Sequence, residues 1–190
     1  MAGKIIVVGT STGGLAAMQV LLPGLPEDFS SPLVVVQHRS KEPGSRLCDF
    51  LQRSSRLPVG EPEDKEPIRP GRVYLAPRDY HLLIETGSFA LSTEAPVYFA
   101  RPSIDVLFDS AADAYGEEVV GVVLTGANGD GARGLKRIKA AGGFALVQEP
   151  STAQARAMPE AAIAATDVDR ILPLNEMASF LNRLCHAPAG

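Results

Sequence analysis

Three residue types that make up a nucleophilic catalytic triad follow apolar segments of this sequence. The first is a serine in Gly9-Thr10-Ser11-Thr12-Gly13, a G-x-S-x-G pattern between an apolar run and a helical pattern. Glycines permit a sharp turn that lifts a serine hydroxyl above a sheet. The following helix then directs its free N–H groups and positive dipole end toward the same place. The segment is therefore a candidate nucleophile elbow.

The same turn has two other readings, an anion-binding loop and a plain tight turn. A dinucleotide-binding fingerprint requires glycine where Ser11 stands, and an acidic residue near the end of the next strand. That second place holds Gln37 and His38. No GK[ST] sequence follows, which excludes a P-loop. The residues of this turn alone leave all three readings open.

His38 and Asp130 follow two further apolar segments. Taken singly, such a histidine is more often a structural residue and such an aspartate more often a helix cap. However, His38 ends the strand that follows the Ser11 unit. Consecutive parallel strands are usually neighbours, so His38 is expected within reach of Ser11 as a general base. If the strand before Asp130 flanks the first strand on its other side, Asp130 can orient the ring of His38.

The elements that must position these residues alternate between apolar runs and helical patterns. We expect strands at 4–8, 33–36, 73–76, 119–124 and 144–147, a hairpin of 82–85 with 89–93, and helices at 14–22, 44–54, 103–115, 133–141 and 174–184. Ser103 is the expected cap of its helix, and 60–70 is an expected exposed loop. Apolar strands each followed by a helix predict a doubly wound α/β fold. Its sheet is mostly parallel with helices on both faces, beside a small antiparallel hairpin.

Composition sets the class of protein. The 190 residues are 45% apolar and 21% charged, which predicts one globular domain over 1–190 with its core at about 4–184. The formal net charge of −4 argues against a nucleic-acid-binding surface. No apolar run approaches the roughly 20 residues of a membrane helix, and no signal peptide is recognisable. Cys48 and Cys185 form no CxxC pair, which predicts free thiols in a cytoplasmic protein and no metal site.

The chain resembles the catalytic domain of the CheB family of chemotaxis protein-glutamate methylesterases. The matching segments run in order over essentially the whole chain, and they are 9–14, 36–38, 76–77, 101–105, 124–131 and 158–159. The resemblance implies that Ser11 is the nucleophile, His38 the base and Asp130 the carboxylate. It implies hydrolysis of glutamate methyl esters on the cytoplasmic helices of chemoreceptors, with release of methanol. Deamidation of certain glutamines is implied as a second activity, and no metal or organic cofactor is implied.

The loop around Asp130 departs from the family pattern Gly-Met-Gly-Xaa-Asp-Gly. Ala127 keeps the backbone N–H that the family is thought to aim at the oxyanion, but it lacks a long side chain to shape the pocket. Asn128 replaces a glycine, and asparagine is the residue that best tolerates a left-handed conformation there. We expect Ala127 and Asn128 to shape the oxyanion site together with Thr12 and Gly13, which follow Ser11.

Three further residues have a functional and a structural reading. Thr12 either holds His38 or Ser11 by its hydroxyl, or caps the following helix. Arg101 either steers an acidic receptor helix as a substrate-binding residue, or pairs with a surface carboxylate. Met158 either lines the substrate cleft or belongs to the core.

Many family members carry an N-terminal receiver domain that blocks the active site until it is phosphorylated. Here the first strand begins at about Lys4, which leaves no room for such a domain. We therefore expect either a stand-alone enzyme or an excised catalytic domain, with an open cleft that is regulated, if at all, by a separate receiver or kinase component. Three alternatives remain: a non-catalytic signalling domain, an esterase for another protein and, with less support, a nucleotide- or anion-binding module.

Overall fold

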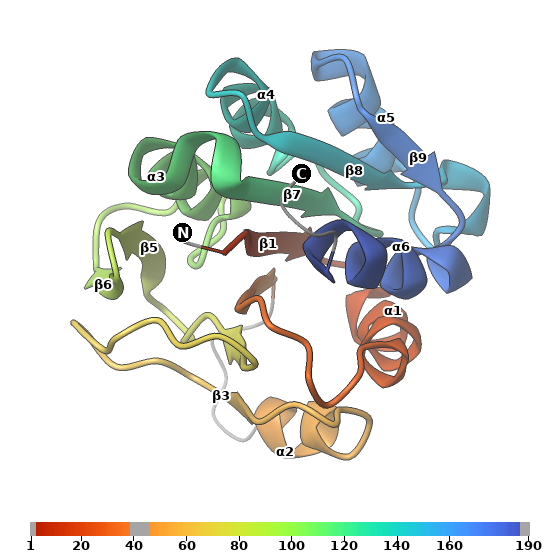
Figure 1. Cartoon of the computed structure of the whole chain (residues 1–190). Helices are drawn as coiled ribbons and strands as arrows, with labels where there is room; N and C mark the ends of the chain where they lie inside the picture. The colour runs from red at the N-terminus through yellow and green to blue at the C-terminus, as the bar shows by residue number, and fades with distance from the viewer. Residues whose placement is uncertain (1–2, 39–45, 187–190) are drawn as a thin grey trace.

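The computed structural model describes residues 3–38 and 46–186, in which strands and helices alternate as expected (Figure 1). The strands are β1 (Ile5–Thr10), β2 (Leu33–Gln37), β3 (Val59–Gly60), β4 (Val73–Leu75), β5 (His81–Glu85), β6 (Ser88–Ser92), β7 (Val119–Val123), β8 (Phe144–Gln148) and β9 (Arg170–Leu172). The helices are α1 (Gly14–Leu21), α2 (Leu47–Gln52), α3 (Ile104–Tyr115), α4 (Ala132–Ala140), α5 (Ala157–Ala165) and α6 (Leu174–His186). Short 3-10 turns occupy Leu22–Gly24, Gly116–Glu118 and Pro150–Thr152.

The main sheet of the described residues is parallel throughout, in the order β3-β4-β2-β1-β7-β8-β9. The strands β5 and β6 form a separate antiparallel hairpin. The predicted doubly wound α/β fold with a small hairpin is confirmed. Strand β1 lies between β2 and β7, with Thr10 opposite Gln37 and Gly9 opposite Val123. The carboxyl ends of these three strands therefore meet at one edge of the sheet, where open α/β sheets bind their ligands.

Alternate residues of β1 supply two separate cores. Ile5 and Val7 pack on one face with the apolar residues of α3, α4, α5 and the hairpin. Ile6 and Val8 pack on the other face with those of α1, α2 and α6. Figure 1 shows α1 and α6 side by side on one side of the sheet and α3 and α4 on the other. Cover on both faces explains why the strand sequences are continuously apolar rather than alternating.

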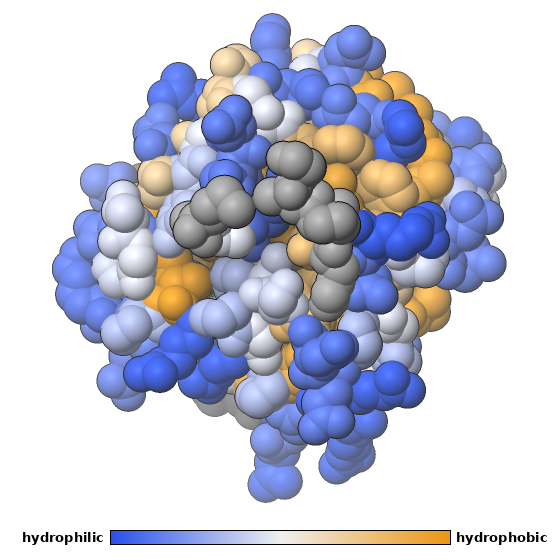
Figure 2. Space-filling view, in the orientation of Figure 1, coloured by the Kyte–Doolittle hydropathy of each residue, from blue (hydrophilic) through white to orange (hydrophobic). Residues whose placement is uncertain are grey.

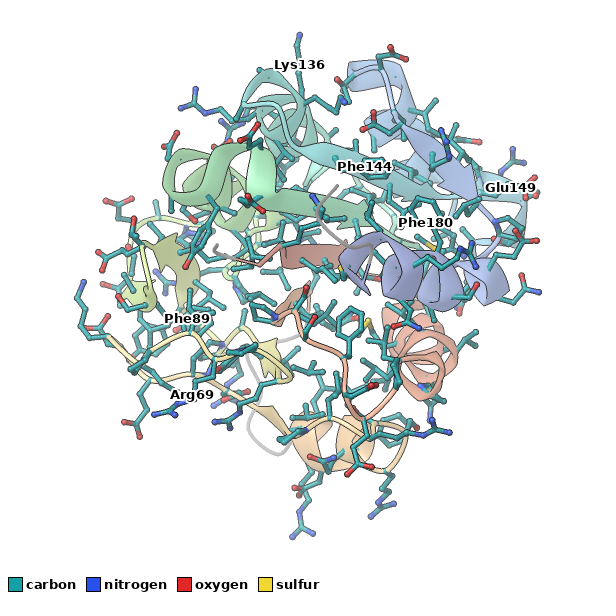
Figure 3. The ribbon with its side chains drawn as sticks, viewed as in Figure 1. Arg69, Phe89, Lys136, Phe144, Glu149 and Phe180 are labelled. Carbon is teal, nitrogen blue, oxygen red and sulfur yellow. The ribbon has the colours of Figure 1, made fainter. Side chains whose placement is uncertain are left out.

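Helix α6 closes the second core through an aromatic contact. Phe144 of β8 and Phe180 of α6 lie with ring centroids 5.7 Å apart (Figure 3). The surface in the same view is largely hydrophilic, with smaller hydrophobic areas between (Figure 2). Among the described residues, no helix combines the length and the apolar character needed to cross a membrane.

Several elements differ from the prediction for physical reasons. The strand β3 is two residues long in a segment rich in proline and glycine, and β9 exposes most of its side chains, so neither shows an apolar run. The helix α5 is rich in alanine and has Pro159 in its first turn, so it lacks a clear polar face. Within the predicted helix 44–54 the structure has α2 at Leu47–Gln52, while residues 44 and 45 lie outside the described residues.

Candidate active site

The turn that carries Ser11 lies at the centre of the strand-end edge. The backbone N–H of Ser11 donates to the carbonyl of Thr125 (2.9 Å), and that of His38 donates to the carbonyl of Thr10 (3.0 Å). The hydroxyl of Thr125 donates to the carbonyl of Thr12 (2.8 Å). These bonds fasten the segments after β2 and β7 to the Ser11 turn from its two sides.

Gly13 is the residue that makes the turn possible. Its φ is 81°, in the left-handed region where a side chain is strained, and it is the N-terminal cap of α1. A Cβ at this position would lie 2.7 Å from the side chain of Gln154. Within the described part of the chain, the backbone N–H groups of Thr12, Gly13 and Ala127 meet no acceptor. These N–H groups are therefore available to a developing oxyanion.

The ring of His38 reaches across β1 to Asp130. Its Nε2 lies 2.7 Å from Oδ2 of Asp130, and the two side chains are 10% and 0% exposed. In the neutral ring this pairing places the proton on Nε2 and leaves Nδ1 as the basic nitrogen. Within the described residues no hydrogen bond joins the Ser11 hydroxyl to His38, a contact that often tightens only when substrate binds.

The start of α3 surrounds the carboxylate of Asp130 with donors. Oδ1 accepts from the hydroxyl of Ser103 (3.0 Å) and the N–H of Asp105 (2.9 Å). Oδ2 accepts from the N–H of Ile104 (2.7 Å) in addition to His38. Burial acts to raise the pKa of Asp130, but the bonds from His38, Asp105 and Ile104 outweigh it and hold the pKa below its ordinary value. Asp130 is therefore ionised at neutral pH and able to orient His38.

Asp105 makes the reciprocal contact with α4. Its Oδ1 accepts from the N–H groups of Gly131 (3.1 Å) and Gly134 (2.7 Å). Its Oδ2 lies 3.4 Å from Nε of Arg133. Burial raises the pKa of Asp105, and the negative charge of Asp130 adds to that rise. The starts of α3 and α4 thus exchange carboxylates in the following sense. Asp105 of α3 accepts from N–H groups at the start of α4, and Asp130, just before α4, accepts from N–H groups at the start of α3.

The capping roles differ from those predicted. Ser103 does stand at the N-terminal cap of α3, but its hydroxyl donates to Asp130 instead of accepting from its own helix. Asp130 was expected either to cap α4 or to contact His38. It contacts His38, and the cap of α4 is Gly131, whose φ is 97°. The reason is the close packing of the two helix starts, because a Cβ on Gly131 would lie 2.7 Å from Ile104.

Gln37 links the candidate nucleophile to the candidate base. Its Nε2 donates to the carbonyls of Ser11 (2.9 Å) and His38 (2.8 Å). Its Oε1 is buried and has no hydrogen-bond partner among the described residues. Gln37 had no predicted role in the site, although a polar side chain that ends an apolar strand just before His38 was a usable signal. Gln37 therefore joins the site as a positioning residue.

Two of the predicted site-shaping residues, Thr12 and Asn128, differ in what their side chains contact. The side chain of Thr12 is exposed and makes no hydrogen bond to the residues that the structure describes, so neither of its two predicted contacts is present. Asn128 does not use the left-handed conformation that asparagine tolerates, since among the described residues positive φ outside glycine is confined to Lys65, Asp79, Tyr98 and Phe99. Instead Oδ1 of Asn128 accepts from the N–H of Asp130 (3.1 Å), which tightens the loop locally.

Arg101 is held by acceptors of its own chain. Its guanidinium donates to Oδ1 of Asp79 (2.8 Å) and to the carbonyls of Thr93 (2.7 Å) and Glu94 (3.0 Å), and its side chain is 16% exposed. The geometry favours pairing with a carboxylate over the steering of a substrate.

Met158 lies in the core. It is 1% exposed, and its side chain covers Gly126 so closely that a Cβ there would lie 2.4 Å from Cε. The core reading of Met158 is therefore favoured over the cleft reading. The described residues also contain no group of three or more His, Cys, Asp and Glu side chains placed to hold a metal ion.

Comparison with known proteins gives a consistent set of relatives. A family model described as CheB methylesterase matches residues 6–181. A Leptospira interrogans protein, provisionally named protein-glutamate methylesterase/protein-glutamine glutaminase, is 47% identical over 95% of this chain and 94% of its own length. A protein of Anaeromyxobacter dehalogenans with the same two activities in its name is 42% identical over 95% of this chain, which spans 53% of that relative.

A solved structure agrees with these relatives. The crystal structure of the Thermotoga maritima CheB methylesterase catalytic domain superimposes with a TM-score of 0.92 at 35% sequence identity. The match covers 97% of this chain and 100% of that domain. The likeness therefore extends over nearly the whole chain.

Proposed function

The chain belongs to the CheB methylesterase family, and on this premise we propose that it hydrolyses glutamate methyl esters on the cytoplasmic helices of chemoreceptors. Methanol is the product released, and deamidation of certain glutamines is a second reaction of the same site. The observation that carries the proposal is the pairing of His38 with the ionised Asp130 at 2.7 Å, across the strand that ends in Ser11. This arrangement supplies a nucleophile, a base and an orienting carboxylate.

In the first half of the reaction, Oγ of Ser11 attacks the ester carbonyl while Nδ1 of His38 takes its proton. Asp130 stays ionised and stabilises the imidazolium through Nε2. The oxyanion of the tetrahedral intermediate is stabilised by the backbone N–H groups after Ser11 and at Ala127. His38 then returns its proton to the departing oxygen, which leaves as methanol.

In the second half, water attacks the glutamyl ester on Ser11. His38 accepts the proton of that water and passes it to Oγ of Ser11 as the acyl group leaves. The products are a free glutamate side chain and the regenerated serine. The same steps release ammonia when the substrate is a glutamine side chain, because His38 then protonates a departing amine.

The same proposal covers the partner and the location. We assign the protein to the cytoplasm, since the helices that carry the esters lie there. A separate receiver or kinase component is the regulator that we propose. The expectation that neither metal nor organic cofactor takes part stays a prediction.

The test is methanol release from a methylated chemoreceptor signalling fragment. Ser11→Ala is expected to lower the rate by about 10³-fold or more, because removing the nucleophile of such a unit costs several orders of magnitude. Ser179→Ala is the matched control, since Ser179 is exposed on α6 and, among the described residues, its hydroxyl bonds only to the carbonyl of Glu176 in that helix. Turnover of a small activated ester without methanol release would indicate an esterase for another protein. Absence of both reactions in the wild type would indicate a non-catalytic signalling domain.

A further inference from the structure

A tight turn before α3 is built from two aromatic residues in a backbone conformation that suits neither. Val97 and Ala100 exchange both backbone hydrogen bonds (3.0 and 2.9 Å), which closes a two-residue hairpin. The two residues between them, Tyr98 and Phe99, have φ of 51° and 59°. Two positive φ values mark the turn type that favours Asn-Gly, and bulky side chains are strained there.

The aromatic side chains of this turn lie in solvent. Phe99 is 104% exposed and Tyr98 is 53% exposed. Folding therefore gains little from either ring, while the backbone is strained to present them. Exposed apolar residues are ordinary when single, but strain confined to a segment that displays two exposed rings points to a role outside the fold.

The base of the turn is held firmly. Arg101 bonds to the carbonyls of Thr93 and Glu94 and to the carboxylate of Asp79. On the other side, Nε2 of His81 bonds to the carbonyl of Ala95 (3.0 Å). Because Arg101 is neutralised by Asp79, it adds no free positive charge to the base of the turn. The rings are therefore presented on a rigid support, which lowers the entropy lost on binding.

The support is connected to the candidate active site. Nδ1 of His81 accepts from the N–H of Ser103 (3.2 Å), and the hydroxyl of Ser103 donates to Asp130. Phe99 precedes Ser103 by four residues, so their Cα atoms are at most about 14 Å apart. The contacts from His81 to Ser103, Asp130 and His38 therefore place the turn on the α3 side of the candidate site. An α-helix rises about 1.5 Å per residue, so about ten residues of a receptor helix that passes over Ser103 cover the distance to the turn.

We propose that the Tyr98–Phe99 turn is a docking tip for the methylated receptor helix, beside the ester that is hydrolysed. This proposal rests on the proposed function. Esterification removes the negative charge of a glutamate and adds a methyl group, so the modified face of the helix becomes more apolar. Two exposed rings match such a face by burying apolar surface. The charged face of an unmodified helix offers the two rings less apolar surface to bury.

The variant that tests this proposal is the double substitution Tyr98→Asn with Phe99→Gly. It replaces both rings with the sequence that this turn type prefers, so the hairpin is retained and its thermal stability is expected to rise. The KM for the methylated receptor fragment is expected to increase by about 10- to 100-fold, the range for loss of an aromatic anchor. The kcat for the fragment and the hydrolysis of p-nitrophenyl acetate are expected to stay within about two-fold. Ile171→Thr, at an exposed apolar position on the edge strand β9, is the control and leaves both assays unchanged.

The outcomes separate this proposal from the function on which it rests. An unchanged KM for the fragment in the double variant overturns the docking role. Equal losses on the fragment and on p-nitrophenyl acetate also overturn it, because the turn would then support the active site itself. If the wild type releases no methanol from the fragment, the proposed substrate is wrong, and the docking role that depends on it is overturned as well.

Discussion

Asp130 and Asp105 are two fully buried carboxylates at neighbouring helix starts, and they are held in opposite ways. Both are 0% exposed, and each accepts backbone N–H groups from the start of the other's helix. Asp130 receives four hydrogen bonds, one of them from His38. Asp105 receives two, and its second oxygen has no hydrogen-bond partner in the described part of the chain, only Arg133 at 3.4 Å.

Equal burial does not shift the pKa of the two carboxylates in the same direction. Desolvation acts to raise the pKa of both groups, yet the pKa of Asp130 is lowered and that of Asp105 is raised. The number and placement of donors therefore decide which carboxylate holds its charge. Asp130 is therefore the carboxylate whose negative charge can balance an imidazolium at His38, whereas Asp105 joins the starts of two helices.

The largest effect is expected from Asp130→Asn, with Asp105→Asn as its matched control. The neutral amide that replaces the Asp130 carboxylate cannot balance the imidazolium or fix the tautomer of His38, so kcat for methanol release should fall by about 10⁴-fold. In Asp105→Asn the amide oxygen still accepts from Gly131 and Gly134, and kcat should fall by less than about ten-fold. Steady-state kinetics of the two variants decide the matter, and equal losses would contradict the division of roles.

Ser103→Ala removes one of the four donors around Asp130 and leaves the three others. A buried acceptor that loses one partner costs about 1–2 kcal/mol, so the free energy of unfolding should fall by that amount. Urea unfolding of the variant beside the wild type measures the loss. A variant as stable as the wild type would show that the hydroxyl contributes nothing.

The dependence of stability on pH should have opposite signs for the two carboxylates. The lowered pKa of Asp130 contributes stability above about pH 3.9, the unfolded value, and this is lost as pH falls through the folded pKa. The raised pKa of Asp105 has the reverse effect, so stability falls as pH rises from about 3.9 through its folded pKa.

Urea unfolding of the two asparagine variants between pH 3 and pH 7 tests these signs. Relative to wild type, the stability of Asp105→Asn should improve as pH rises, because only the wild type must ionise a buried carboxyl whose pKa is raised. The deficit of Asp130→Asn should instead shrink on acidification. If the unfolding free energies of the two variants changed with pH in the same way, the opposite pKa shifts of the two carboxylates would be contradicted.

The smallest effect is expected from Arg133→Gln. The side chain of Arg133 is 61% exposed and lies against Asp105 and Asp109. Exposed ion pairs contribute about 0–1 kcal/mol, so the free energy of unfolding should change by no more than about 0.5 kcal/mol. Repeating the unfolding at high salt should reduce the difference further. A larger loss would mean that Arg133 is the main support of the Asp105 charge.

The parts of the fold that follow from local pattern were predictable. Apolar runs such as 33–36 and 119–124 mark strands buried on both faces, and consecutive parallel strands are usually neighbours. Strand order then places His38 and Asp130 on the two sides of β1. The donors of Asp130 could not be predicted, because they depend on how closely α3 packs on α4. The role of Gln37 also escaped, since its partners are carbonyls, which every residue possesses.

Other local details were equally hard to predict. The side chain of Asn128 accepts from the N–H of Asp130, a contact that residue type alone does not specify. The helix α5 and the strand β9 lack strong periodicity, because tertiary packing rather than amphipathic pattern maintains them.

The exchange of carboxylates between α3 and α4 joins catalysis to local unfolding. The amide hydrogens of Ile104 and Asp105 bond to Asp130, and that of Gly134 bonds to Asp105. These amides exchange with solvent only when the helix starts separate, and the same separation releases the carboxylate that orients His38. The exchange rate of these three backbone amides therefore reports how often Asp130 is released from its helix contacts and His38 loses its paired carboxylate. In refolding, activity should return only when both helices have docked together.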